Sequence, residues 1–141
     1  MHDSFYPTRP KAGYCTYPDF DSIILKMTKE ELRAVEEFQI ENQHGSILFL
    51  GQTDLVDVDL AKDVTIKPRN IEVYPNDDSK PDIGSKLNKG ALVTLEGGMK
   101  PKRGLNAAEY EESLKSSIEK HGGVHLSYDF LKSCWMFKVP H

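Results

Sequence analysis

Two histidines of this 141-residue chain have a spacing that could bind metal. His121 and His125 lie four positions apart, which on a helix would direct two imidazoles at one ion. Gly122 and Gly123 lie between them, and two consecutive glycines favour the end of a helix. The pair therefore does not predict a metal site, and we expect neither a metal nor another cofactor.

Three aspartates, Asp54, Asp57 and Asp59, could supply the oxygen ligands of a calcium loop. The glycine turn and the distal glutamate of such a loop are missing, so a solvated strand face is the better interpretation. The sequence also contains no phosphate-binding glycine loop, no nucleophile elbow and no paired-carboxylate signature. Chemistry-bearing motifs alone leave the function open.

The formal net charge is -4, from 18 basic and 22 acidic residues. This balance argues against a dedicated nucleic-acid-binding protein, which must neutralise many phosphates. Lys100, Lys102 and Arg103 form one basic loop, and a solvated loop is the common role of such a cluster. Binding of RNA or of a membrane surface by these three residues is the alternative.

Cysteine spacing and hydropathy indicate a soluble intracellular protein. Cys15 and Cys134 are far apart and belong to no cluster, so neither a zinc site nor a disulfide framework is expected. The sequence contains no apolar run near the ~20 residues that a membrane span needs, and the first residues lack the apolar core of a signal peptide.

The hydrophobic pattern predicts a flexible leader over residues 1–12 and one α+β domain over residues 13–141, with a largely antiparallel sheet. Residues 55–60 are expected to be extended and half exposed, and residues 76–81 to form a polar loop. A capping box at Asn106 and Glu109 begins the clearest helix, which runs to about His121. The expected strands are 13–17, 46–50, 64–66, 71–74, 91–95, 124–131 and 134–139.

The segment after Asp19 is less certain in type. A short helix is expected through Ile23–Leu25, and a second capping box at Thr28 and Glu31 begins another helix. Local propensity extends that helix to about Phe38, whereas Val35, Phe38 and Ile40 also suit a strand.

Five ordered blocks of the sequence match known motifs. Residues 80–97 are similar to the signature K-P-x-[IV]-G-x-x-L-N-[RK]-x-A-x-V-T-L-[DE]-G. Residues 13–18 resemble G-Y-x-T-x-P, residues 45–51 resemble G-S-I-x-F-x-G, residues 71–74 match the strand before the polar loop, and residues 135–141 are similar to W-x-F-K-V-x-H. With these blocks, residues 13–141 resemble one family, the autoproteolytic domain of the GLFG-repeat nucleoporins.

The resemblance implies a six-stranded, mainly antiparallel β-sheet sandwiched with flanking helices and a small two-stranded sheet. It also implies a strand near residues 34–41. We adopt that strand in place of the helix that local propensity extends to Phe38.

The family resemblance also implies chemistry. Members cut their own backbone after a His-Phe pair, just before a serine that attacks the preceding carbonyl in an N-to-O acyl shift. His141 matches the histidine that takes the serine proton, Asn88 a polar position near the scissile bond, and Lys89 the family's Arg/Lys position. Gly90 stands where the family often has a lysine.

The given sequence ends at His141, so the expected Phe and Ser lie beyond it. A single-turnover serine-type autopeptidase is thus implied by resemblance, and the sequence as given is expected to be inactive. Pro140 and Cys134 depart from the small or polar residues usual in the family at those positions.

After cleavage, the resemblance implies a docking domain at the nuclear pore complex of the nuclear envelope, serving protein and mRNA transport. A groove beside the terminal strand, with Trp135, Phe137 and Val139, would capture peptides of other nucleoporins and anchor an FG-repeat chain. The implied partners are the scaffold nucleoporin from the same precursor and a propeller-bearing nucleoporin of the cytoplasmic face. Direct nucleic-acid binding and membrane insertion are not expected; a non-cleaving peptide-binding or RNA-associated module is the alternative.

Overall fold

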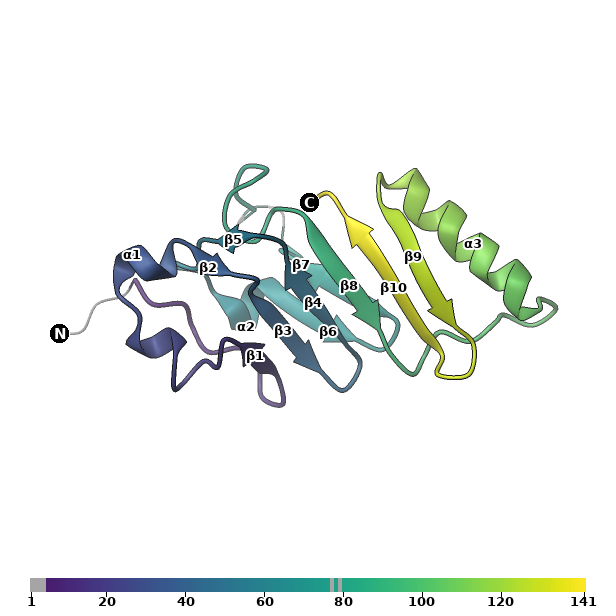
Figure 1. Ribbon diagram of the computed structural model, residues 1–141, viewed down its shortest axis with the longest axis horizontal. Coiled ribbons are helices and arrows are strands. Elements are labelled where there is room, and N and C mark those ends of the chain that lie inside the picture. The colour runs from purple at the N-terminus through teal and green to yellow at the C-terminus, as the bar shows by residue number, and fades with distance from the viewer. Residues whose placement is uncertain (1–4, 77, 79) are drawn as a thin grey trace.

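The computed structural model describes residues 5–76, 78 and 80–141, and a six-stranded sheet runs through the length of the molecule (Figure 1). Every pair of neighbouring strands is antiparallel, as predicted. From one edge to the other the strands are β1 (Cys15–Tyr17), β3 (Gln39–Asn42), β4 (Gly45–Phe49), β8 (Ala91–Leu95), β10 (Cys134–Val139) and β9 (Val124–Asp129).

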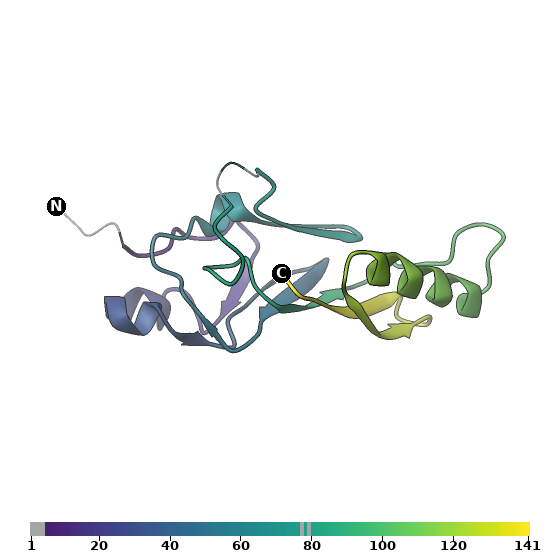
Figure 2. The same cartoon turned by 90° about the horizontal axis from the view of Figure 1, so that it is seen from above.

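Two ribbons of two strands accompany this sheet where one was expected. They are β2 (Val35–Glu36) with β5 (Gln52–Thr53), and β6 (Val64–Lys67) with β7 (Asn70–Val73). The helices are the 3-10 helix η1 (Ile24–Lys26), α1 (Lys29–Leu32), α2 (Leu60–Asp63) and α3 (Ala107–Lys120). Figure 2 shows the β6–β7 ribbon and α3 over the same face of the large sheet, with the C-terminus between them.

Alternation along the central strands builds the core beneath the ribbon and the helix. Successive side chains of a strand point to opposite faces, so every second residue is buried. Ile47 and Phe49 of β4, Val93 of β8, and Trp135 and Phe137 of β10 are all buried. Burial of these large side chains is the main source of stability of the sheet.

The strand near residues 34–41 is confirmed, and the extension of the helix to Phe38 is wrong. The Thr28 capping box forms, yet α1 ends at Leu32. Pairing of β3 with β4 buries Ile40 completely, which a helix continuing from Thr28 would not achieve. Tertiary packing therefore overrides local helix propensity here.

Residues 55–60 are half exposed, as expected, because Val56, Val58 and Leu60 are buried whereas Asp57 is exposed. The expectation that they are extended is wrong, since the chain turns and enters α2. Asp54 pairs with the Lys86 ammonium at 3.0 Å, and Asp59 caps α2 by accepting from the Lys62 N–H at 3.0 Å. Asp54 and Asp59 thus serve an ion pair and a helix cap, and no metal-binding group of three His, Cys, Asp or Glu side chains occurs among the described residues.

Residues 5–12 of the predicted leader contact the domain. The Tyr6 hydroxyl donates to the Met27 carbonyl at 2.8 Å, and the Lys11 ammonium donates to the carbonyls of Ala61 and Val64. Residues 1–4 of the leader, and Asp77 and Ser79 of the polar loop, lie outside the described residues. No helix in the described part of the chain is long and apolar enough to cross a membrane.

The close approach of β4 to β8 gives a stability prediction. A Cβ at Gly45 would lie 2.3 Å from the Thr94 carbonyl oxygen, whereas a Cβ at Gly90 would meet nothing nearer than 3.7 Å. We expect Gly45→Ala to lower the free energy of unfolding by about 1–3 kcal/mol, because the two strands must separate. Gly90→Ala is the matched control, with a change below about 0.5 kcal/mol. Equal chemical-denaturation curves for the two variants would contradict this packing.

Candidate functional site

The pairing of β8 with β10 brings two distant parts of the chain together. The strands are antiparallel, with Val139 opposite Ala91 and Phe137 opposite Val93. The end of β10 therefore lies beside the start of β8, next to the segment Asn88–Gly90. A Cβ at Gly90 would lie 3.7 Å from the carbonyl oxygens of both Val139 and Pro140.

A cavity of about 190 Å³ opens at this junction, between the large sheet and the β6–β7 ribbon. Its walls are mainly apolar, and the polar lining side chains come from Tyr74, Lys80, Asn88, Lys89 and His141. The apolar lining consists of Ile47, Phe49, Ile71, Val73, Leu87, Ala91, Val93, Phe137 and Val139. An apolar cavity with a few convergent polar groups is the usual form of a binding site.

Asn88 is buried and held by its own loop. Its side-chain N–H donates to the Pro81 carbonyl at 2.8 Å. Its backbone N–H donates to the Ser85 carbonyl, and its backbone carbonyl accepts from the Gly84 N–H. An amide group has two N–H donors. One N–H fixes the side chain, and the second is the group that could stabilise an oxyanion in the cavity.

Lys89 faces the neighbouring β5. Its ammonium donates to the Gln52 carbonyl and lies 3.3 Å from the Thr53 hydroxyl oxygen. Burial lowers the pKa of Lys89, against the opposing effect of the Glu37 and Glu36 carboxylates. A lysine held in this way presents a fixed cation whose proton is easier to remove than that of a solvated lysine.

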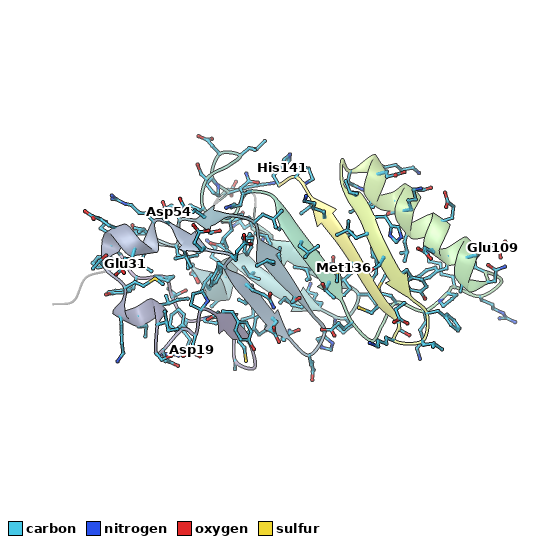
Figure 3. All side chains as sticks on the ribbon, viewed as in Figure 1. Asp19, Glu31, Asp54, Glu109, Met136 and His141 are labelled. Carbon is cyan, nitrogen blue, oxygen red and sulfur yellow. The ribbon has the colours of Figure 1, made fainter. Side chains whose placement is uncertain are left out.

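His141 follows β10 and Pro140, is exposed, and lines the same cavity. Figure 3 shows it at the end of the terminal strand, beside the loop that leads into β8. The structure thus brings His141 together with Asn88 and Lys89, two adjacent residues that are far from it in the sequence. An imidazole that can accept a proton, an amide donor and a cation around one cavity suit acyl chemistry on a nearby backbone carbonyl.

The three residues expected beside the terminal strand differ in position. Phe137 and Val139 line the cavity. Trp135 lies one step further along the same face of β10, where its ring packs on Phe137 with centroids 4.2 Å apart. Trp135 does not line the cavity itself and packs on Phe137, which does.

Tyr74 is a cavity residue that the sequence did not indicate. Its hydroxyl accepts the Leu87 N–H at 3.1 Å, which ties the end of β7 to the loop carrying Asn88. Burial raises its pKa, so the phenol stays neutral. Strict strand alternation would point Val73 and Tyr74 to opposite sides, but Tyr74 has a left-handed backbone with φ of 54° and turns toward the cavity. No sequence signal marks that turn.

The other candidates lie elsewhere. His121 and His125 have different partners, the Ser117 carbonyl and the Glu111 carboxylate, so they do not converge on a metal. Lys100, Lys102 and Arg103 are exposed in the loop before α3, and none of them lines the cavity.

Comparison with known proteins identifies relatives over nearly the whole chain. It is 36% identical to the nuclear pore complex protein Nup98-Nup96 of Dictyostelium discoideum, over 96% of this chain and 7% of that protein. It is 30% identical to the nuclear pore complex protein NUP98A of Arabidopsis thaliana, over 99% of this chain and 14% of that protein. The chain thus spans a small part of these relatives. Their names confirm the predicted location at the nuclear pore complex.

Solved structures share the fold. The Chaetomium thermophilum Nup145N APD T994A mutant fused to Nup145C N superposes with a TM-score of 0.78 at 28% identity, over 91% of this chain and 93% of that chain. The C-terminal domain of the nuclear pore complex component NUP116 from Candida glabrata gives a TM-score of 0.76 at 24% identity, over 95% and 93%. The family model described as Nup98-96 autopeptidase S59 matches residues 11–141. The chain therefore belongs to the Nup98-96 autopeptidase family of nucleoporins.

Proposed function

We propose that this domain cleaves its own backbone one residue beyond His141, between a phenylalanine and a serine, and that the same cavity afterwards docks peptide segments of other nucleoporins. The observation that carries the proposal is the convergence of His141, Asn88 and Lys89 on one apolar cavity at the end of β10. Family membership agrees with self-cleavage.

In the proposed reaction, the serine hydroxyl attacks the carbonyl carbon of the preceding phenylalanine while the His141 imidazole takes its proton. The C–N bond of the tetrahedral intermediate breaks, the amine leaves with a proton, and an ester remains. Water then hydrolyses the ester to a free carboxylate and the serine hydroxyl. The second Asn88 N–H would stabilise the oxyanion. The Lys89 ammonium, held by the Gln52 carbonyl of β5, would add positive charge at the edge of the cavity.

The shape of the cavity supports both halves of the proposal. Its apolar lining suits the aromatic ring that follows His141, and burial of an aromatic side chain is strongly favourable. A ring anchored there would hold the scissile bond next to Asn88. Once the bond is cut, the same apolar surface can accept a matching side chain from another segment.

The partner proposal is drawn from relatives. Three relatives carry the double name Nup98-Nup96, and the solved Chaetomium domain is fused to Nup145C N. We infer that the docked segments come from the scaffold nucleoporin of the same precursor and from a propeller-bearing nucleoporin of the cytoplasmic face. Docking of this kind would anchor the FG-repeat chain at the pore.

Cleavage can be tested on the chain extended after His141 by Phe-Ser and a short polar tail. We expect two fragments, the first with the mass of the chain ending in that phenylalanine, as measured by mass spectrometry. The same extension carrying Ala in place of Ser should stay intact, because it lacks the nucleophile. Intact Phe-Ser protein, or a cut at another bond, would refute the self-cleavage proposal.

The role of His141 gives a kinetic prediction. His141→Ala in the extended chain should slow cleavage by roughly 10²- to 10⁴-fold, the usual contribution of a general base. His121→Ala is the matched control, because His121 is exposed and its ring lies within hydrogen-bond distance of the Ser117 carbonyl of its own helix. An unchanged rate in His141→Ala, followed by gel electrophoresis over time, would exclude this histidine as the base.

Docking in the cavity can be distinguished from docking in a second groove on the other side of the terminal strand. The second groove is lined by Leu50, Gly90, Gly122, Val124, Lys138, Val139 and Pro140. Val73→Trp should fill the cavity and weaken binding of nucleoporin fragments at least about tenfold, measured by titration calorimetry. Val124→Trp obstructs the second groove and should leave the affinity unchanged. The opposite pattern would move docking to the second groove.

A further inference from the structure

A chain of hydrogen bonds joins the terminal strand to α3. The Trp135 indole Nε1–H donates to His125 Nδ1 at 3.1 Å, and His125 Nε2 lies 2.8 Å from the Glu111 carboxylate oxygen. The three residues belong to β10, β9 and α3, which lie side by side in Figure 1. The imidazole is largely buried, with 11% of the side chain exposed.

The chemistry of the three groups defines the form of the histidine. An indole nitrogen is a donor only, so His125 Nδ1 must accept and cannot carry a proton. The ring proton is therefore on Nε2, which donates to Glu111. A doubly protonated imidazolium would present an N–H on both sides, and the bond to Trp135 would be lost.

These hydrogen-bonded side chains are connected to the cavity through Phe137. Trp135 packs on Phe137, and Phe137 lines the cavity. His125 also lies directly opposite Phe137 in the register of β9 and β10. An indole fixed by His125 thus supports the wall against which the bound side chain would pack.

We propose that neutral His125 is a positioning residue. It links the Trp135 indole of β10 to Glu111 of α3 and so holds the wall of the cavity in its binding form. The part that concerns cleavage rests on the proposed function above, and the part that concerns Trp135 does not. Loss of the acceptor at His125 Nδ1 would release the indole and loosen that wall.

The His125 ring is held from two sides. From α3 the Glu111 carboxylate faces the ring, and from β10 the Trp135 indole donates to it. Tyr110 of α3 packs edge-on against Tyr128 of β9. Burial raises the pKa of Tyr110 and of Tyr128.

Trp135 is the single tryptophan of the chain, so its fluorescence reports this contact directly. We expect His125→Leu to shift the emission maximum away from that of the wild type, because the indole N–H loses its acceptor. His125→Gln should keep the wild-type emission, since a glutamine can accept from Trp135 and donate to Glu111. His121→Gln, the matched control, should also keep it.

His125→Leu emission equal to that of the wild type would overturn the proposal, and so would a His125→Gln protein that emits like His125→Leu. Circular dichroism confirms that each protein stays folded. This experiment uses the chain ending at His141 and is independent of cleavage.

The link to the site is tested in the chain extended by Phe-Ser. His125→Leu leaves the buried indole N–H without an acceptor and should slow cleavage about tenfold, because a smaller fraction of molecules keeps the wall in place. His125→Gln should cleave within about twofold of the wild-type rate, which a loss of stability alone would not explain. Equal rates for Leu and Gln would contradict the positioning role.

Discussion

The antiparallel register of β8 and β10 is the constraint on which the rest of this site depends. With Val139 opposite Ala91, the end of the terminal strand meets the loop that carries Asn88 and Lys89. A slip of one residue would turn Phe137 and Val139 to the other face of the sheet. The apolar wall, the amide and the imidazole would then no longer share a cavity. The register is set by burial, because Val93, Leu95, Trp135 and Phe137 are all in the core.

The polar side chains around the cavity are held by backbone groups rather than by one another. Asn88 donates to the Pro81 carbonyl, Lys89 to the Gln52 carbonyl, and Tyr74 accepts from the Leu87 N–H. Such contacts orient the side chains before any segment binds, which reduces the cost of ordering them later. His141 is different, since it is exposed at the end of its strand.

Sequence patterns predict most strands and α3, because the alternation of β4, β8 and β10 and the Asn106 capping box are local signals. Local signals fail where packing decides. The Thr28 capping box is real, yet the chain leaves the helix to pair β3 with β4. His141, Asn88 and Lys89 follow from the family resemblance, whereas the roles of Tyr74 and His125 depend on a left-handed turn and on cross-strand contacts. Neither feature is visible in residue spacing.

The central claim is that the polypeptide continues from His141 into the cavity between the sheet and the β6–β7 ribbon. The most direct test is a crystal structure of the chain extended by Phe-Ala and a short tail, which keeps the peptide uncut. The account predicts the phenylalanine ring against Phe49, Phe137 and Val139, with its carbonyl oxygen near the Asn88 side-chain amide. A ring in solvent, or in the groove beside Leu50 and Val124, would contradict it.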